Sequence, residues 1–216
     1  MIYRFLNDIK KTYECKKVNV GVFENVKVEG SKIHIEAYDL SGMGRIALIE
    51  VKGFLNLWQM QSMIVNPLAK DAPIYYYHRH NRKGNDIYKV EVLNTLLDDR
   101  ELGMFAPVLE KYAEIPDMED KENWYDEIKM PGTVLKKINK SEKEKIDELA
   151  VEHFNAYKKV LMSAPECSKS AKKAEMKEFI DGLVEWSGIA VLQLFRAYYD
   201  KMVAKKLCTD VLFDVK

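Results

Sequence analysis

The sequence predicts an α+β fold, with an antiparallel sheet in its first half and helices from its second half covering that sheet. Runs of alternating Ile, Val and Tyr lie almost back to back up to Leu97. The breaks between them, such as Lys52-Gly53 and residues 82–85, are shorter than the dozen or so residues that a parallel crossover needs. After Leu97 the apolar spacing becomes helical. We therefore expect about six antiparallel strands within residues 17–97, with helices on both faces.

The elements of the first half follow from the apolar spacing. Residues 2–14 are predicted to form a short amphipathic helix, because apolar residues recur there at helical intervals. Two alternating runs then flank Glu29-Gly30-Ser31, which reads as a tight turn. The run after Pro73 is predicted to be a central strand, and it holds an unusual concentration of rings, Tyr75-Tyr76-Tyr77-His78-Arg79-His80.

The second half is predicted to be helical. Residues 101–112 form a plausible helix that Pro107 would disturb, and residues 115–130 are acidic and irregular. A capping-box pattern at Ser141 begins a helix that runs to Leu161. Further helices are expected over residues 171–186 and 189–206. The sequence holds no repeat and no low-complexity linker. We therefore expect a single domain over residues 1–216, in which a helix at 2–14 and a sheet at about 17–97 precede a helical half at about 98–216.

Composition narrows the classes of partner. Among the 216 residues, Lys and Arg together count 34 and so do Asp and Glu, giving a formal net charge of zero. That balance offers no broad attraction for nucleic acid or for an anionic membrane, and no apolar run approaches the roughly 20 residues of a membrane span. The 3 cysteines form no C-x-x-C pair. We expect a cytoplasmic protein, a monomer or weak homodimer, whose redox electrons would come from a partner or a bound cofactor.

Three features of the sequence resemble the ferredoxin-dependent bilin reductases and their relative, red chlorophyll catabolite reductase. The first is Arg45-Ile-Ala-Leu-Ile-Glu50, similar to a family strand in which a basic residue begins an alternating run to a Glu. The second is Asn66-Pro67 followed by Asp71-Ala72-Pro73, similar to the family's "D-x-P" before the next central strand. The third is the C-terminal segment from Val191 to Val215, with its terminal Leu-Phe-Asp.

The resemblance implies a fold and a reaction. Family members fold as a three-layer α/β/α sandwich around an antiparallel sheet, and a linear tetrapyrrole such as biliverdin binds between the sheet and the C-terminal helices. Reduced ferredoxin supplies electrons singly, no metal or flavin is bound, and side chains and water supply the protons. The resemblance thus implies an oxidoreductase that has a bilin-like ligand and ferredoxin as partners and binds no cofactor of its own.

The resemblance also implies site residues, with departures from the family pattern. The family's pocket Glu falls on Glu50. The pocket His of one branch falls near Gln61 or Ser62, so that imidazole is missing. The proton-donating Asp of the central strand falls on His78, and an Asp of the C-terminal helices falls near Glu185. Because two proton-handling positions differ, the substrate and the bond reduced cannot be carried over.

His78 and Glu50 are the catalytic candidates. His78 and His80 share one face of their strand, and an imidazole facing a pocket can exchange protons near neutral pH. The alternatives are a solvated strand end and, less favoured, a metal site at this histidine pair. Glu50 follows Ile46 and Leu48 at alternate positions of one strand, so its side chain is expected to point to the same buried face. Burial there would raise the pKa of its carboxyl group toward that of a usable acid. Its alternative is an edge position paired with a basic residue. The expectation is that Glu50 and His78 face one cavity.

The remaining candidates would bind the ligand. Arg45 and Arg196 could hold propionates through paired guanidinium hydrogen bonds, and Tyr76 could wall a flat ligand, although each has an ordinary structural explanation. The full substrate-binding set is Arg45, Ser62, Tyr76, His80, Glu185 and Arg196. Two other functions stay open: a scaffold that binds a tetrapyrrole or another flat ligand without reducing it, and an interaction module whose pocket is filled.

Overall fold

The computed structural model describes residues 1–53, 55, 57–82, 85–138 and 142–216. Its centre is an antiparallel sheet in which eight strands are described, in the order β1-β3-β4-β5-β6-β7-β8, with β2 also pairing with β3. The strands are β1 (Cys15–Val18), β2 (Asn25–Val28), β3 (Ser31–Leu40), β4 (Gly44–Lys52), β5 (Trp58–Pro67), β6 (Ile74–Arg82), β7 (Asn85–Leu93) and β8 (Val134–Ile138). The α+β prediction is confirmed.

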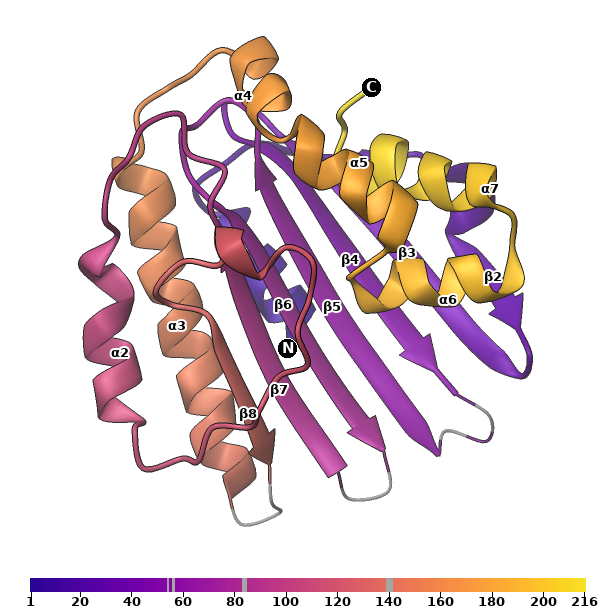
Figure 1. The fold of residues 1–216 in the computed structure, drawn as a ribbon, viewed down its shortest axis with the longest axis horizontal. Helices are drawn as coiled ribbons and strands as arrows, with labels where there is room; N and C mark the ends of the chain where they lie inside the picture. Colours follow the sequence, from indigo (N-terminus) through magenta and orange to yellow (C-terminus); the bar gives the residue numbers. More distant parts are fainter. Residues whose placement is uncertain (54, 56, 83–84, 139–141) are drawn as a thin grey trace.

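The helices fall in three groups along the chain (Figure 1). The first is α1 (Ile2–Ile9) alone, ahead of the sheet. The second comprises α2 (Ala106–Lys111) and α3 (Lys143–Ser163). The third comprises α4 (Lys169–Glu175), α5 (Lys177–Trp186), α6 (Ala190–Tyr198) and α7 (Lys201–Lys206), which continues into a π-helical turn, Leu207–Leu212. Short 3-10 turns lie at Gly21–Phe23, Gly103–Phe105 and Asp126–Ile128.

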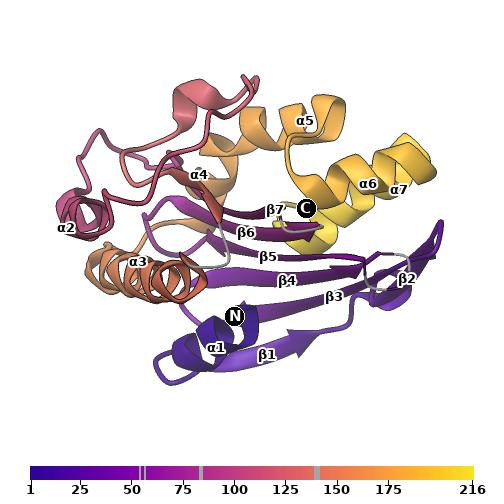
Figure 2. The ribbon, with the colours of Figure 1, turned by 90° about the horizontal axis from the view of Figure 1, so that it is seen from below.

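Two hydrophobic cores lie on the two faces of the sheet, which makes the molecule a three-layer sandwich (Figure 2). One core joins α1 and α3 to strand residues such as Leu48, Met63 and Tyr77. The other joins α5, α6 and α7 to strand residues of the opposite parity, such as Ile49 and Tyr76. Both faces are apolar because each central strand is covered on both sides, so its buried residues form a nearly continuous run.

The strand register fixes which side chains share a face. Directly paired residues of antiparallel strands point to the same side of the sheet. Glu50 pairs with Gln61, and Gln61 in turn pairs with Arg79. One residue along, Ser62 pairs with Ile49 on one side and with His78 on the other. The second set lies under the C-terminal helices and the first set lies on the opposite face.

Several predicted boundaries need correction. The sheet has more strands than the six expected, and β8 comes from the half predicted to be helical. The helix expected over residues 171–186 is two helices, α4 and α5, which meet at Met176. The helix expected over 189–206 also divides, because Tyr199 is extended between α6 and α7. The predicted cap Ser141 and the middle of the 82–85 turn, residues 83 and 84, lie outside the described residues.

Asp71, from the Asp-x-Pro segment, anchors the C-terminal helices to the sheet. Its buried carboxylate accepts a hydrogen bond from the Leu97 backbone N–H at 2.9 Å. The same carboxylate pairs with Lys172 of α4 at 3.1 Å and with Arg100 at 2.7 Å. Because the Lys172 side chain is fully buried, this ion pair fixes where α4 lies. The segment therefore has a structural role in this chain.

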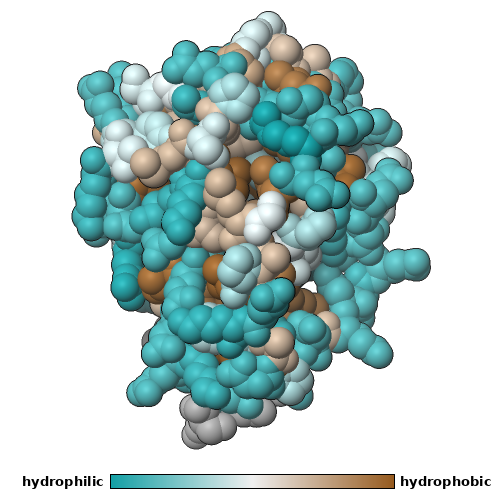
Figure 3. All heavy atoms as spheres, turned by 90° about the vertical axis from the view of Figure 1, so that its left-hand side faces the viewer, coloured by the Kyte–Doolittle hydropathy of each residue, from teal (hydrophilic) through white to brown (hydrophobic). Residues whose placement is uncertain are grey.

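The side of the molecule that carries α2 and α3 is mainly hydrophilic, with small scattered apolar patches (Figure 3). Among the residues that the structure describes, no helix combines the length and apolar character needed to cross a bilayer.

Candidate functional site

A cavity of about 560 Å³ opens between the sheet and α6. Its floor comes from β5 and β6, and its roof from one side of α6. The volume lies within the range of roughly 300–1,000 Å³ that is typical of small-molecule sites. The lining residues are Trp58, Met60, His78, His80, Ala190, Gln193, Leu194, Ala197 and Tyr198.

His78 is held by two hydroxyl groups. Its Nδ1 lies 2.9 Å from Ser62 Oγ and 3.3 Å from Tyr76 OH. Ser62 is buried on the neighbouring strand, and Tyr76 OH accepts a hydrogen bond from the Ala190 backbone N–H at 3.5 Å, at the start of α6. If the hydroxyls donate to Nδ1, the ring proton resides on Nε2. The imidazole is then oriented by the sheet, and Nε2–H is the group left for a ligand.

His78 is neutral near neutral pH. Burial, with smaller contributions from His80 and Lys89, lowers the pKa of His78 to about 3. The aromatic surroundings contribute to this burial, since the His80 ring centroid lies 6.3 Å from that of His78 and 5.7 Å from that of Trp58. In this state His78 can donate one hydrogen bond and accept another, but it is not the imidazolium. A negative charge beside the ring is needed before His78 can act as an acid.

A buried carboxylate, Glu91, also lies on the face that carries His78. Glu91 pairs with Tyr76 in the register, and its side chain is fully buried. Lys89 Nζ lies 2.7 Å from it, Lys129 Nζ 3.1 Å, and Tyr125 OH donates to it at 3.1 Å. Two ammonium groups and a phenol satisfy this carboxylate, as a buried charge requires. Glu91 was not among the predicted site residues.

The structure brings four predicted site residues together. Ser62, Tyr76 and His78 form one hydrogen-bonded group, and His80 lines the same cavity. Their common feature is parity, because alternate residues of β6 and the paired residue of β5 face one side. Tyr76, His78 and His80 come from the ring-rich segment, whereas Tyr75 and Tyr77 of the same segment belong to the core on the other face of the sheet.

Glu50 does not join this group, so the expectation that Glu50 and His78 face one cavity is wrong. Glu50 belongs to the opposite face, where its carboxylate accepts from Gln61 Nε2 at 2.9 Å and from Tyr3 OH at 3.3 Å. Its parity with Leu48 was predicted correctly, but that parity leads to the α1 side. In the register, Ile49 occupies the place beside Ser62 and His78.

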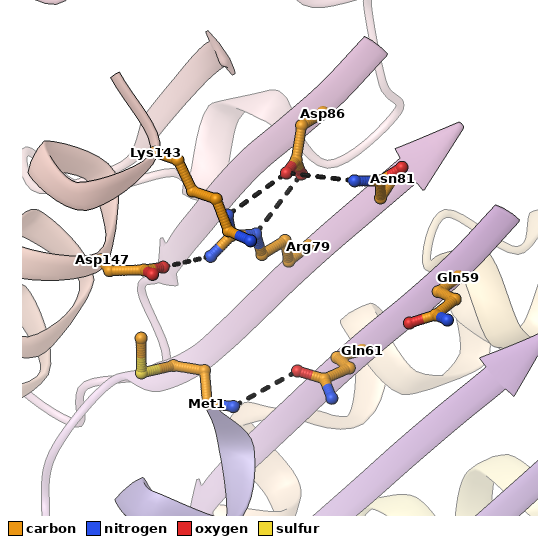
Figure 4. A pocket seen from close by; sticks show the side chains of 8 residues that line it. All are labelled: Met1, Gln59, Gln61, Arg79, Asn81, Asp86, Lys143 and Asp147. Carbon is orange, nitrogen blue, oxygen red and sulfur yellow. Dashed lines mark hydrogen bonds and ion pairs between the residues drawn. The ribbon is translucent and has the colours of Figure 1, made fainter. Parts of the chain in front are cut away.

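A smaller polar cleft of about 250 Å³ lies beside Glu50 on that face (Figure 4). Gln61 lines it and accepts from the Met1 amino group at 3.4 Å. Arg79 also lines it, and its guanidinium pairs with Asp147 and, at 3.2 Å, with Asp86 (Figure 4). The Arg79 guanidinium, the cation at the centre of this cleft, is therefore already neutralised by two carboxylates.

Arg45 is a structural residue and not a ligand partner. Its buried guanidinium donates to the backbone carbonyls of Asp210 at 2.8 Å and Val211 at 3.1 Å. It also pairs with Asp39 at 2.7 Å and with Asp214 at 3.2 Å. With these partners it ties the C-terminal segment to β4, and the predicted propionate contact at Arg45 is wrong.

Glu185 and Arg196 lie outside the His78 cavity. Arg196 is exposed on α6 and donates to the backbone carbonyl of Glu185. Glu185 pairs with Lys201 and lines a different cavity, formed by α5 and the segment before β8. No arginine or lysine is among the described residues that line the His78 cavity. A ligand there would leave its carboxylates at the mouth, in water.

The alternative of a histidine metal site gains no support. Within the described ranges, no group of three or more His, Cys, Asp or Glu side chains is arranged to hold a metal ion.

Comparison with known proteins bears on the fold alone. No protein-family model matches the chain, and no curated protein sequence matches it. A crystal structure of phytochromobilin synthase from tomato, in complex with biliverdin, superposes with a TM-score of 0.79 at 9% sequence identity. The match covers 99% of this chain and 82% of that one. This chain has the bilin reductase fold. The resemblance found in the sequence is thus confirmed at the level of the fold.

Proposed function

We propose that this protein binds a linear tetrapyrrole in the cavity between the sheet and α6, and reduces it with single electrons from ferredoxin. The observation that carries the proposal is the group formed by His78, Ser62 and Tyr76, because it places an oriented imidazole against a ligand-sized cavity. The shared fold supports the choice of ligand, since the similar tomato protein was crystallised with biliverdin.

The proposed reaction adds two electrons and two protons across one double bond of the tetrapyrrole. Two reduced ferredoxin molecules would each give one electron, and each would leave oxidised. Trp58, Met60 and Leu194 give the cavity apolar walls for a flat conjugated ligand. The protein would then have to deliver protons at the right moment, because an untrapped radical can return its electron.

His78 would couple proton delivery to electron arrival. In the resting site its pKa is held low by burial, so the imidazole is neutral. A negative charge placed on a ligand beside the ring raises that pKa, because an opposite charge favours the imidazolium. The first electron would thus draw a proton onto His78, from which it can pass to the ligand. Water entering at the mouth of the cavity would supply the second proton.

A binding protein without reductase activity is the second candidate, and a specific observation favours it. The described residues that line the cavity include no carboxylic acid, and His78 is the neutral imidazole and not the imidazolium at neutral pH in the ligand-free protein. A site without a proton source would hold a tetrapyrrole and leave it oxidised.

Absorption spectroscopy separates these functions. Titration with biliverdin is expected to give a saturable shift of its visible band in a one-to-one complex. Addition of reduced ferredoxin, regenerated by its reductase and NADPH, is expected to convert that band into a product band. A band that shifts but then persists would support the binding protein. Failure of biliverdin to bind would refute both.

A further inference from the structure

A second and larger cavity, of about 950 Å³, lies between α5 and the segment 123–128. It is the cavity that Glu185 lines. Its chemistry differs from that of the His78 cavity, and nothing in the proposed reaction uses it.

The charge of this cavity is predominantly negative. Five of its described lining residues are carboxylates and one is a lysine: Glu127, Glu175, Glu178, Asp181, Glu185 and Lys177. Lys177 pairs with Asp181, and Glu185 pairs with Lys201 outside the lining. Among the described residues, no basic group pairs with the other three carboxylates, those of Glu127, Glu175 and Glu178. An anionic tetrapyrrole would be repelled here, and a cation would be attracted.

Aromatic rings form the apolar walls. Trp124 and Trp186 pack edge to face with their centroids 5.3 Å apart, and Phe179 lies 5.9 Å from Trp124. Trp186 is 65% exposed, which is unusual for so large an apolar side chain. Gly182 makes the arrangement possible, because a Cβ at that position would lie 2.2 Å from the Trp124 ring.

An unpartnered hydroxyl also belongs to this cavity. Thr95 lines it and is only 2% exposed. Its Oγ1 has no hydrogen-bond partner among the described residues. Leaving a buried hydroxyl unpaired is unfavourable, so such a group normally has a partner, whether protein, water or ligand. A ligand N–H would satisfy Oγ1.

We propose that this cavity binds a linear organic polycation, an alkyl chain that carries several ammonium groups. Its methylene segments would lie against the tryptophans, and its ammonium groups would meet the carboxylates and the aromatic faces. The spacing of the acids suits such a chain. Glu178, Asp181 and Glu185 recur at i, i+3 and i+7 on one side of α5, so they are placed roughly 5 and 10 Å along the helix axis. Ligand ammonium groups at Asp181 and Glu185 would take the places of Lys177 and Lys201, which pair with these two acids on the exposed surface. Ammonium groups separated by three or four carbons have a similar spacing.

Spermidine is the probe, and tryptophan fluorescence is the readout. The Trp58→Phe protein leaves Trp124 and Trp186 as the reporters, because the chain has 3 tryptophans. Saturable quenching at one site per chain is expected, with a matching heat in calorimetry. The double variant Glu175→Gln/Glu178→Gln, made in the same background, should weaken binding about tenfold or more. Trp186→Ala should weaken it as well.

The matched control removes the same charge elsewhere. Glu144→Gln/Glu148→Gln changes two exposed acids of α3, and it is expected to leave the spermidine affinity within twofold. Equal weakening by both double variants would show only diffuse attraction to surface charge and would overturn the proposal. Unsaturable quenching, or no change in Glu175→Gln/Glu178→Gln, would also overturn it. None of these outcomes depends on biliverdin, so this proposal and the tetrapyrrole proposal are tested separately.

Discussion

Glu50 and His78 lie on opposite faces of the central sheet, although both were expected at one catalytic site. The register places Glu50 with Gln61 and Arg79, toward α1, and His78 with Ser62, toward α6. They cannot act on the same ligand atom. The carboxylate that shares a face with His78 is Glu91, which is fully buried beside Lys89, Lys129 and Tyr125.

Substituting His78 separates ligand binding from proton transfer. In His78→Ala, biliverdin affinity is expected to stay within about threefold, because most of the cavity wall is apolar. Turnover with reduced ferredoxin should fall by a factor of about 10², the usual scale for loss of a general acid or base. His78→Asp should restore part of the rate. Stopped-flow absorption measures both quantities, and an unchanged turnover in His78→Ala would remove His78 from the mechanism.

Glu50 is expected to be dispensable for the reaction. Glu50→Gln keeps the size of the side chain and can still contact Gln61 and Tyr3, so the free energy of unfolding should change by less than about 0.5 kcal/mol. Biliverdin affinity and turnover should stay within twofold. A loss of turnover tenfold or larger in a folded Glu50→Gln protein would restore Glu50 as a catalytic residue and contradict the site described here.

Glu91 is expected to matter for stability. Glu91→Gln removes the fully buried carboxylate that Lys89 and Lys129 share and leaves these lysines with the more exposed carboxylates of Asp120 and Asp126. The expected loss is about 2 kcal/mol in the free energy of unfolding, below the full cost of breaking a buried ion pair. Urea denaturation measures it, with Glu50→Gln as the matched control for the same chemical change on the opposite face. Equal stability of the two variants would show that the Glu91 network contributes nothing net.

Asp71 should anchor the C-terminal helices. Asp71→Asn leaves Lys172 fully buried without its carboxylate, at an expected cost of about 3 kcal/mol. Asp98→Asn is the control, since Asp98 pairs with the same Arg100 but its side chain is 61% exposed. It should cost less than about 0.5 kcal/mol. Comparable losses in the two variants would mean that the buried pair contributes no more than a surface pair.

His153 should make stability depend on pH. It is fully buried, its Nδ1 lies 3.2 Å from Tyr75 OH, and its Nε2–H donates to the Gly132 carbonyl at 2.8 Å. Burial lowers its pKa to about 4, whereas an unfolded histidine has a pKa of about 6.5. Between these values the unfolded chain binds the extra proton, so this contribution to stability is present above pH 6.5 and is lost as the pH falls toward 4.

The measurement compares wild type with His153→Gln at two pH values. From about pH 7 to about pH 5, wild type is expected to lose about 2 kcal/mol of unfolding free energy more than the variant loses. His153→Gln should be less stable at pH 7 but should show a shallower pH dependence. Parallel curves for the two proteins would show that His153 titrates in the folded state much as it does in the unfolded one.

The sequence predicted most of the sheet because its physical signals are local. Alternation and short breaks identified the strands from Ser31 to Leu93, and the ring-rich segment is a central strand as expected. β8 was missed because its five residues follow an irregular stretch and pair with a strand distant in sequence. Strand alternation also predicted correctly that Glu50 points to the same face as Leu48. The sequence could not predict which helices cover which face, because that depends on the path of the chain in space.

Glu91 illustrates the same limit. In the sequence it is one charged residue in the run Asn85–Leu93, where alternation suggests a solvated position. Its burial results from Tyr125 and Lys129, which reach it from a segment more than 30 residues later along the chain. The only available signal in the sequence was that Glu91 would face the same side of the sheet as Tyr76 of the neighbouring strand. That signal requires the register to be known first.

The most direct test of the central claim fills the cavity under α6. Leu194→Trp places an indole between α6 and the strand residues His78 and Met60, whereas Met202→Trp adds the same ring at an exposed position of α7. Thermal unfolding and circular dichroism first establish that both variants fold. The account predicts that biliverdin shifts its absorption band with wild type and with Met202→Trp, and not with Leu194→Trp. Full biliverdin binding by a folded Leu194→Trp protein would contradict it.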